Sequence, residues 1–199
     1  FDATVGEDVD EAIELLHAVA TIQENQIDDP YTAADTHQRI LEIEADDEES
    51  ARALRRLLRE QERWDELADL LRDQIRLTAD PDRSLELKLE LADILRSELQ
   101  EPTSALDTYR EILNVEPGYE PAVEALDEMF GSEEQLRSDI ADMLEPVYRS
   151  QENYAGLVDV LQAKGEEAPD PADGVPFLEE AARIAEDELE DPARAYETY

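Results

Sequence analysis

Cysteine is absent from this sequence of 199 residues, and glycine is scarce, with only 6 positions. The lack of cysteine excludes disulfides, thiolate metal sites and cysteine nucleophiles, and it leaves the redox compartment unmarked. No glycine-rich phosphate loop occurs, and no apolar run approaches the roughly 20 residues that a membrane-spanning helix needs. We therefore expect a soluble, helix-rich protein of unassigned compartment. The sequence opens at Phe1 without a methionine or a signal-like segment and stops at Tyr199 inside an expected helix, so we interpret it as part of a longer protein.

Basic residues are also scarce in this sequence. The chain has 17 Lys and Arg against 55 Asp and Glu, which gives a formal net charge of −38. Nucleic acids and anionic membranes are recognised by clustered basic residues, so both are disfavoured as partners. Basic proteins, cations or salt suit such a surface better. The charge also has a plainer interpretation, which is a solvated acidic coat adapted to a saline setting.

One sequence pattern occurs three times, and its period defines the architecture. The first copy begins at Asp29, the second 72 residues later at Glu101, and the third 90 residues after that at Asp191. The longer second offset places one additional helix-length segment between Glu120 and Tyr148. Periods of this kind indicate stacked supersecondary units. The copies are Asp29-Pro30-x-x-Ala33-x-x-x-His37-x-x-Ile40-Leu41, Glu101-Pro102-x-x-Ala105-x-x-x-Tyr109-x-x-Ile112-Leu113 and Asp191-Pro192-x-x-Ala195-x-x-x-Tyr199.

Each repeat predicts two helices joined by the acidic-proline step. The acidic side chain can cap the free amides of the second helix, and proline suits the first helical position because its missing N–H costs nothing there. This rule places helix starts at Pro30, Pro102 and Pro192. The predicted antiparallel helix pairs cover about residues 9–45, 48–78, 83–117, 120–167 with the inserted helix, and 175–199, where the last pair is truncated.

Two local signals refine this map. The motif Ser132-x-x-Gln135 resembles a capping box and predicts the start of the inserted helix. The segment 166–174 contains two prolines and a glycine, and this cluster predicts the clearest loop of the chain.

Residues Ala105, Tyr109 and Pro117 resemble the tetratricopeptide repeat. In that family a small residue early in the second helix, an aromatic ring four positions later and a proline after the helix mark each unit. The stretch 62–71, with its Trp64, resembles the repeat as well. The similarity covers nearly the whole chain.

The resemblance implies a right-handed α-solenoid of antiparallel helix pairs, whose first helices line a concave groove that receives peptides or protein segments. Stacking leads to a similar surface independently, because a helix pair cannot bury its apolar face alone and neighbouring pairs must cover it. The chain departs from the family at Arg55 and Asp93, where a small residue is preferred. We therefore expect an all-α, tetratricopeptide-like fold rather than a strict member.

The most specific local feature is an arginine stripe in one predicted helix. Arg52, Arg55, Arg56, Arg59 and Arg63 fall within an arc of roughly 100°. Because guanidinium forks match carboxylates, four of them, Arg52, Arg56, Arg59 and Arg63, are predicted to hold an acidic peptide or a chain-terminal carboxylate. The alternative is that the arginines only neutralise acids nearby in the sequence. Those acids are Glu42, Glu44, Asp46 and Asp47.

Other chemistry finds little support in the residues. His17 and His37 are the only histidines, and His37 takes the position of Tyr109, so we expect it in the core. An EF-hand register near residue 173 fails because Pro169 and Pro171 occupy its first and third ligand positions. With 55 carboxylates, pairs at helical spacing arise by chance and do not indicate acid-base catalysis. We predict no catalytic residue, no metal site and no cofactor.

The sequence thus favours a non-enzymatic scaffold that binds a peptide or protein segment in the concave groove. Two alternatives stay open. One is a structural spacer or self-assembly element of a larger protein, and the other is an acidic domain that responds to cations.

The charge generates a first prediction, that salt stabilises this protein. At low ionic strength the excess acidic side chains, which give the net charge of −38, repel one another and destabilise the fold. At physiological salt the screening length falls to about 8 Å, and this repulsion weakens. The melting temperature, followed by circular dichroism, should rise between low and high sodium chloride. A melting temperature that salt leaves unchanged would contradict it.

Overall fold

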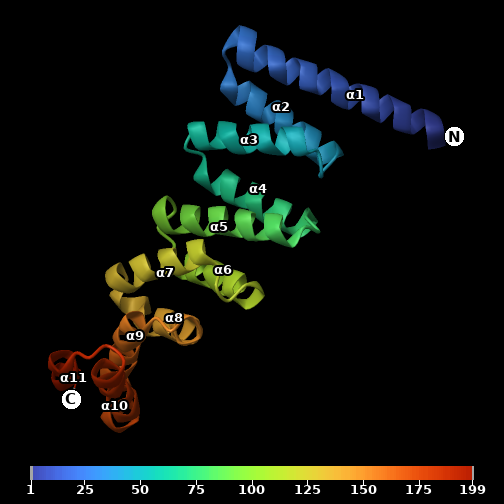
Figure 1. Cartoon of the computed structure of the whole chain (residues 1–199). Helices are drawn as coiled ribbons and strands as arrows, with labels where there is room; N and C mark the ends of the chain where they lie inside the picture. Colours follow the sequence, from blue (N-terminus) through green and yellow to red (C-terminus); the bar gives the residue numbers. More distant parts are fainter. Residues whose placement is uncertain (1, 199) are drawn as a thin grey trace. The chain divides into compact units, whose positions relative to one another are not determined.

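The computed structural model describes residues 2–198, and these residues form helices joined by short connections, without a strand (Figure 1). The predicted all-α class is confirmed. None of the described helices is both long and apolar enough to cross a membrane. The helices are α1 (Asp2–Ile22), extended by a π-helical turn (Gln23–Ile27), α2 (Pro30–Ile43), α3 (Glu48–Glu60), α4 (Trp64–Leu77), α5 (Pro81–Ser97), α6 (Pro102–Val115), α7 (Glu120–Ser132), a 3-10 turn (Glu134–Leu136), α8 (Arg137–Gln151), α9 (Tyr154–Glu166), α10 (Pro171–Asp187) and α11 (Pro192–Thr198).

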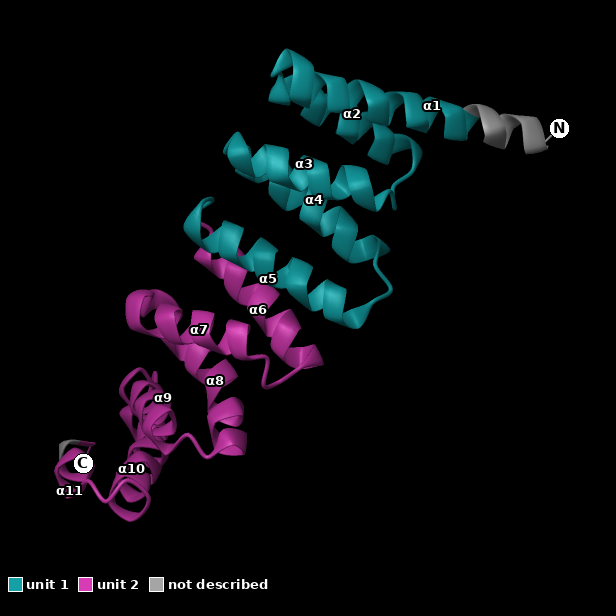
Figure 2. Cartoon of the chain, turned by 45° about the horizontal axis from the view of Figure 1, so that its top comes forward, with its two compact units in different colours: residues 1–100 teal, residues 101–199 magenta. Residues whose placement is uncertain are grey.

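The chain divides into two compact units, residues 1–100 and 101–199 (Figure 2). In unit 1, helices α1 to α5 run back and forth, and each packs against the next one along the chain. In unit 2, α6 packs against α7 and α8, and α7, α8, α9 and α10 each pack against the next helix along the chain. The predicted packing of neighbouring helices is confirmed within each unit.

The acidic-proline steps start helices as predicted. Helices α2, α6 and α11 begin at Pro30, Pro102 and Pro192. The Asp29 carboxylate accepts a hydrogen bond from the backbone N–H of Thr32 at 3.1 Å, which satisfies one of the amides that a helix start leaves free. Glu101 precedes α6 without such a side-chain bond, so there proline sets the start alone.

A residue in the left-handed backbone conformation lies just before each of these helix starts. Asp28, Gln100 and Glu190 each have a positive φ and stand two residues before the proline that opens the next helix. Glu62 and Glu152 have the same conformation two residues before α4 and α9. A left-handed residue after a helix turns the chain back sharply, which brings consecutive helices into antiparallel contact.

The repeated positions are packing positions. Ala33 and Ala105 are fully buried, and so are Ile40 and Ile112. Three helices separate α2 from α6, whereas four separate α6 from α11, so the described chain has the additional helix that the longer offset predicts. In the third copy, the position of His37 and Tyr109 is taken by Tyr199, which lies outside the described residues.

Two local predictions are wrong. The loop expected at 166–174 is limited to 167–170, because α9 ends at Glu166 and α10 begins at Pro171, where Asp170 caps the amide of Ala172 at 2.9 Å. The motif at Ser132 is not a capping box. Ser132 is the last residue of α7, and its hydroxyl donates to the carbonyl of Glu128 at 3.0 Å, so that α8 begins later, after the 3-10 turn.

Gly174 and Gly165 let α9 and α10 approach closely. A Cβ on Gly174 would lie 2.2 Å from the carbonyl oxygen of Gly165, and a Cβ on Gly165 would lie 2.5 Å from the Leu178 side chain. Glycine in this part of the chain therefore serves helix contact and not a flexible loop.

Replacing Gly174 by alanine should destabilise unit 2. Alanine favours helix by about 1 kcal/mol over glycine, but here the new methyl group would collide with backbone, and such overpacking costs about 1–3 kcal/mol. The net loss is measurable as a lower urea midpoint by circular dichroism. The matched control is Gly131→Ala in α7, where a Cβ meets nothing within 4 Å, and it should stabilise or leave the midpoint unchanged. Equal responses of the two variants would refute the close-packing role.

Candidate functional site

Three of the four predicted ligand residues lie together on α3. The side chains of Arg52, Arg56 and Arg59 remain 67, 50 and 54% exposed, respectively. They follow one another at helical spacing, opposite the buried Leu54 and Leu58. The charged side of α3 is therefore at the surface of unit 1. We call Arg52, Arg56 and Arg59 the α3 arginine face.

The arginines of α3 bridge this helix to the extension of α1 and to α5. Arg56 pairs with Glu24, in the turn that extends α1. Arg59 and Arg55 donate to the two carboxylate oxygens of Glu90 on α5, at 2.7 and 3.0 Å. Since these bridges lead from α3 both back to the α1 extension and forward to α5, the alternate elements share one face of unit 1.

Arg63 does not belong to this face, and the prediction that it shares the helix is wrong. Helix α3 ends at Glu60, and Arg63 is the residue that precedes α4. Its guanidinium donates to Glu66 on α4, which raises the pKa of Arg63, and it also donates to Gln61 at 3.0 Å. Arg63 lies three residues beyond the end of α3, on the far side of the left-handed Glu62, so the arginine spacing extends past the helix.

The arginines of α3 are paired both with acids close to them in the sequence and with acids on other elements. Arg52 lies 3.8 Å from Glu48 on its own helix, and Arg56 also contacts Glu60 at 3.3 Å. Asp47, one of the four acids predicted, instead caps the amide of Ser50 at 2.7 Å and contacts His17 at 3.3 Å. Interhelix register, rather than distance along the chain, selects the long-range partners.

The two histidines meet inside unit 1. His37 is buried, as predicted, with Ser50 at 3.2 Å from one ring nitrogen and Glu24 at 3.3 Å from the other. Its ring makes an edge contact with His17, the centroids lying 6.3 Å apart. Burial lowers the pKa of His37, although Glu24 opposes the shift. No group of three or more His, Asp or Glu residues within 2–198 is arranged to hold a metal ion.

Unit 2 contains a half-buried ionic network that sequence reasoning missed. Lys164 donates to Asp142 at 2.7 Å and to Glu145 at 2.6 Å, and its ammonium lies 4.9 Å from the centre of the Phe177 ring. Burial acts to raise the pKa of Glu145, but hydrogen bonds from Lys164 and Arg149 outweigh it and lower the pKa. Arg149 extends the network to Glu180 on α10. Every charge here has a partner within the chain, so the network holds α8, α9 and α10 together.

His37 predicts a specific pH dependence of stability. Because its pKa is lower in the folded state than the usual value near 6.5, the unfolded chain binds the proton first, and stability falls as pH drops through about 6.5. The melting temperature should be lower at pH 5.5 than at pH 7.5. In His37→Tyr, which installs the residue found at the equivalent Tyr109, this difference should shrink. An unchanged difference in the variant would assign the effect to other groups.

Comparison with known proteins adds no family to these observations. No protein-family model matches the sequence, and no curated protein matches it as a relative. The tetratricopeptide likeness therefore rests on the repeated residues of the chain itself.

Proposed function

We propose that this chain is a non-enzymatic scaffold that binds an acidic segment of a partner protein on the α3 arginine face. The observation that carries the proposal is local. In a chain with a net charge of −38, three guanidinium groups lie on one helix and stay at least half exposed. Guanidinium is the side chain best suited to paired hydrogen bonds with a carboxylate.

The intrachain pairs of this face leave it available. Exposed ion pairs contribute only about 0–1 kcal/mol, because water screens both charges and ordering the side chains costs entropy. Arg52 illustrates this, since its contact with Glu48 is 3.8 Å long and both side chains are largely exposed. A carboxylate from a partner can replace such an acid at little cost.

A tetratricopeptide-like, right-handed superhelix is part of this proposal. It is supported by the repeated alanine and aromatic positions and by the antiparallel packing of neighbouring helices within each unit. In such an arrangement α1, α3 and α5 are first helices, and the face that they share is the concave one. The bridges from Arg56 to Glu24 and from Arg59 to Glu90 join these same elements.

The same bridges favour a second candidate, a structural element without a ligand. In this function Arg56 and Arg59 serve to join α3 to its neighbours, and the arginine face balances the acidic charge of unit 1. The two functions differ in whether neutralising the face changes binding or only stability.

The test uses a photo-crosslinking residue in place of Glu49, which is exposed on α3 one turn before Arg52. The partner captured from a native lysate is identified, and its crosslinked segment is synthesised for fluorescence anisotropy. We expect an acidic segment that binds roughly tenfold or more weakly to Arg52→Gln/Arg56→Gln/Arg59→Gln, because each charge-assisted hydrogen bond contributes about 1.5–3 kcal/mol when its partner is ionised.

The matched control neutralises three arginines elsewhere, Arg72, Arg76 and Arg110. Each of them forms an exposed ion pair with an acid three residues away on its own helix. It has the same net charge as the test variant and should bind as the unmodified protein does. Circular dichroism establishes that both variants are folded. Equal affinity of the test variant and the control would exclude the arginine face, and crosslinks to no partner would favour the structural element.

A further inference from the structure

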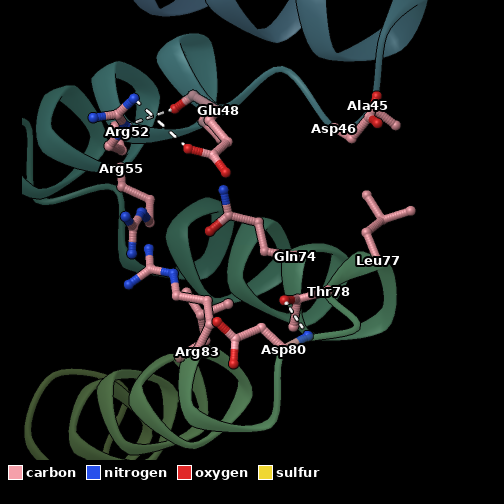
Figure 3. Close-up of a pocket in the computed structure, with 12 residues that line it drawn as sticks. Ala45, Asp46, Glu48, Arg52, Arg55, Gln74, Leu77, Thr78, Asp80 and Arg83 are labelled. Carbon is pink, nitrogen blue, oxygen red and sulfur yellow. Dashed lines mark hydrogen bonds and ion pairs between the residues drawn. The ribbon is translucent and has the colours of Figure 1, made fainter.

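A cavity of about 600 Å³ opens in unit 1 next to the α3 arginine face (Figure 3). Its walls come from α3, the end of α4, the beginning of α5 and the connection that follows α2. It shares Arg52 with the arginine face, but the least exposed arginine of its lining is Arg55, whose side chain is only 14% exposed. Its polar lining also includes Gln74 and Arg83, and its apolar lining includes Ala51, Leu77 and Leu87.

Two buried polar atoms of these lining residues lack a hydrogen-bond partner among the described residues. They are Nε of Arg55, which is a donor, and Oε1 of Gln74, which is an acceptor. Buried donors and acceptors are nearly always satisfied, and leaving one unmatched is costly. The third such atom, Nδ1 of His17, lies outside the lining. Both atoms are covered by neighbouring protein atoms, so a ligand that offers one acceptor and one donor satisfies them only after the Arg55 and Gln74 side chains turn toward the cavity.

The charges in the cavity point to a single anionic group. Figure 3 shows the guanidinium groups of Arg55 and Arg83 facing each other from α3 and α5. The two cations repel each other, although Glu90 and Glu86 pair with them from outside the lining. An anion placed between two guanidinium groups relieves this repulsion and gains charge-assisted hydrogen bonds.

The acidic part of the lining limits what that anion can be. Asp46, Glu48 and Asp80 also line the cavity, so a multiply charged phosphate would be repelled. A carboxylate carries one charge, and in a peptide it is accompanied by amide N–H donors. The apolar wall, with Ala51, Leu77 and Leu87, provides contact for an aliphatic side chain.

We propose that this cavity seats one carboxylate of the bound segment between Arg55 and Arg83, while a neighbouring N–H of the segment donates to Gln74. The carboxylate comes either from the end of the partner chain or from an Asp or Glu side chain. This inference rests on the proposed function and names its ligand chemistry. It assigns binding to Arg55, Gln74 and Arg83, none of which the sequence singled out as a ligand residue.

The test uses small probes, so that it does not depend on the identity of the partner. N-acetyl-leucine carries a terminal carboxylate, N-acetyl-aspartate α-methylamide a side-chain carboxylate, and N-acetyl-leucine methylamide none. Each is titrated into the ¹⁵N-labelled whole chain, and the Arg55 Nε–H and Gln74 amide signals are followed by NMR. At least one carboxylate probe should give saturable shifts in the millimolar range, and the two probes distinguish the two sources. The methylamide of leucine should give no saturable shift.

Two variants locate the binding. Arg83→Gln, whose side chain is partly exposed and pairs with Glu86, should weaken binding of the carboxylate probe roughly tenfold. Gln74→Leu should weaken binding of the carboxylate probe several-fold. It should not lower the melting temperature, because the substitution removes an amide oxygen that has no hydrogen-bond partner among the described residues. The matched control Arg72→Gln, on α4 outside the lining, should bind normally.

Three results would overturn the proposal. They are equal shifts with the acid and the methylamide, unchanged affinity in Arg83→Gln and Gln74→Leu, and no saturable shift at high millimolar probe. Failure to capture a partner protein would count against the scaffold alone, since the probes report on the cavity directly. Conversely, if the captured segment binds Arg83→Gln as tightly as the unmodified protein, the scaffold proposal stands and the carboxylate seat is excluded.

Discussion

Burial of helices between helices is the constraint on which the rest of this structure depends. A single helix of this composition exposes an apolar stripe, and only neighbours packed along it remove that stripe from water. Leu54, Leu57 and Leu58 of α3 show this, since three residues within one and a half turns are all buried. The sharp reversals at left-handed residues and the capped starts at Pro30 and Pro171 bring consecutive helices into this contact.

Charge is organised around that packing. With 55 acidic residues and 17 basic ones, each cation has many acids within reach, and the chain uses guanidinium groups to bridge separate helices. Arg59 does so in unit 1 through Glu90, and Arg149 does so in unit 2 through Glu180. The Arg59 bridge lies at the surface, where ion pairs are weak and exchangeable, whereas Arg149 belongs to the half-buried network of unit 2. Arg55 differs because packing has drawn its guanidinium inward, where one donor remains without a partner.

The errors of sequence interpretation come from residues with two physical uses. Proline breaks helices and also starts them, and the rule that found Pro30 applies equally to Asp170-Pro171, where a loop was predicted instead. Glycine marks loops and also close contacts, and only the approach of α9 and α10 shows which use Gly174 has. Likewise, helical spacing grouped Arg63 with Arg59, although a left-handed residue separates them.

The sequence by itself determined the all-helical class, the helix starts at Pro30, Pro102 and Pro192 and the buried repeat positions, because these depend on local backbone geometry and on the period of apolar residues. It also determined that some side of α3 carries arginine. Tertiary structure alone decided which acids Arg55, Arg56 and Arg59 meet on other elements, since these partners stand 31 to 35 residues apart. It likewise decided that Arg55, Gln74 and Arg83 line one cavity. Helical periodicity fixes the direction of a side chain, but only the register between packed helices fixes what that side chain faces.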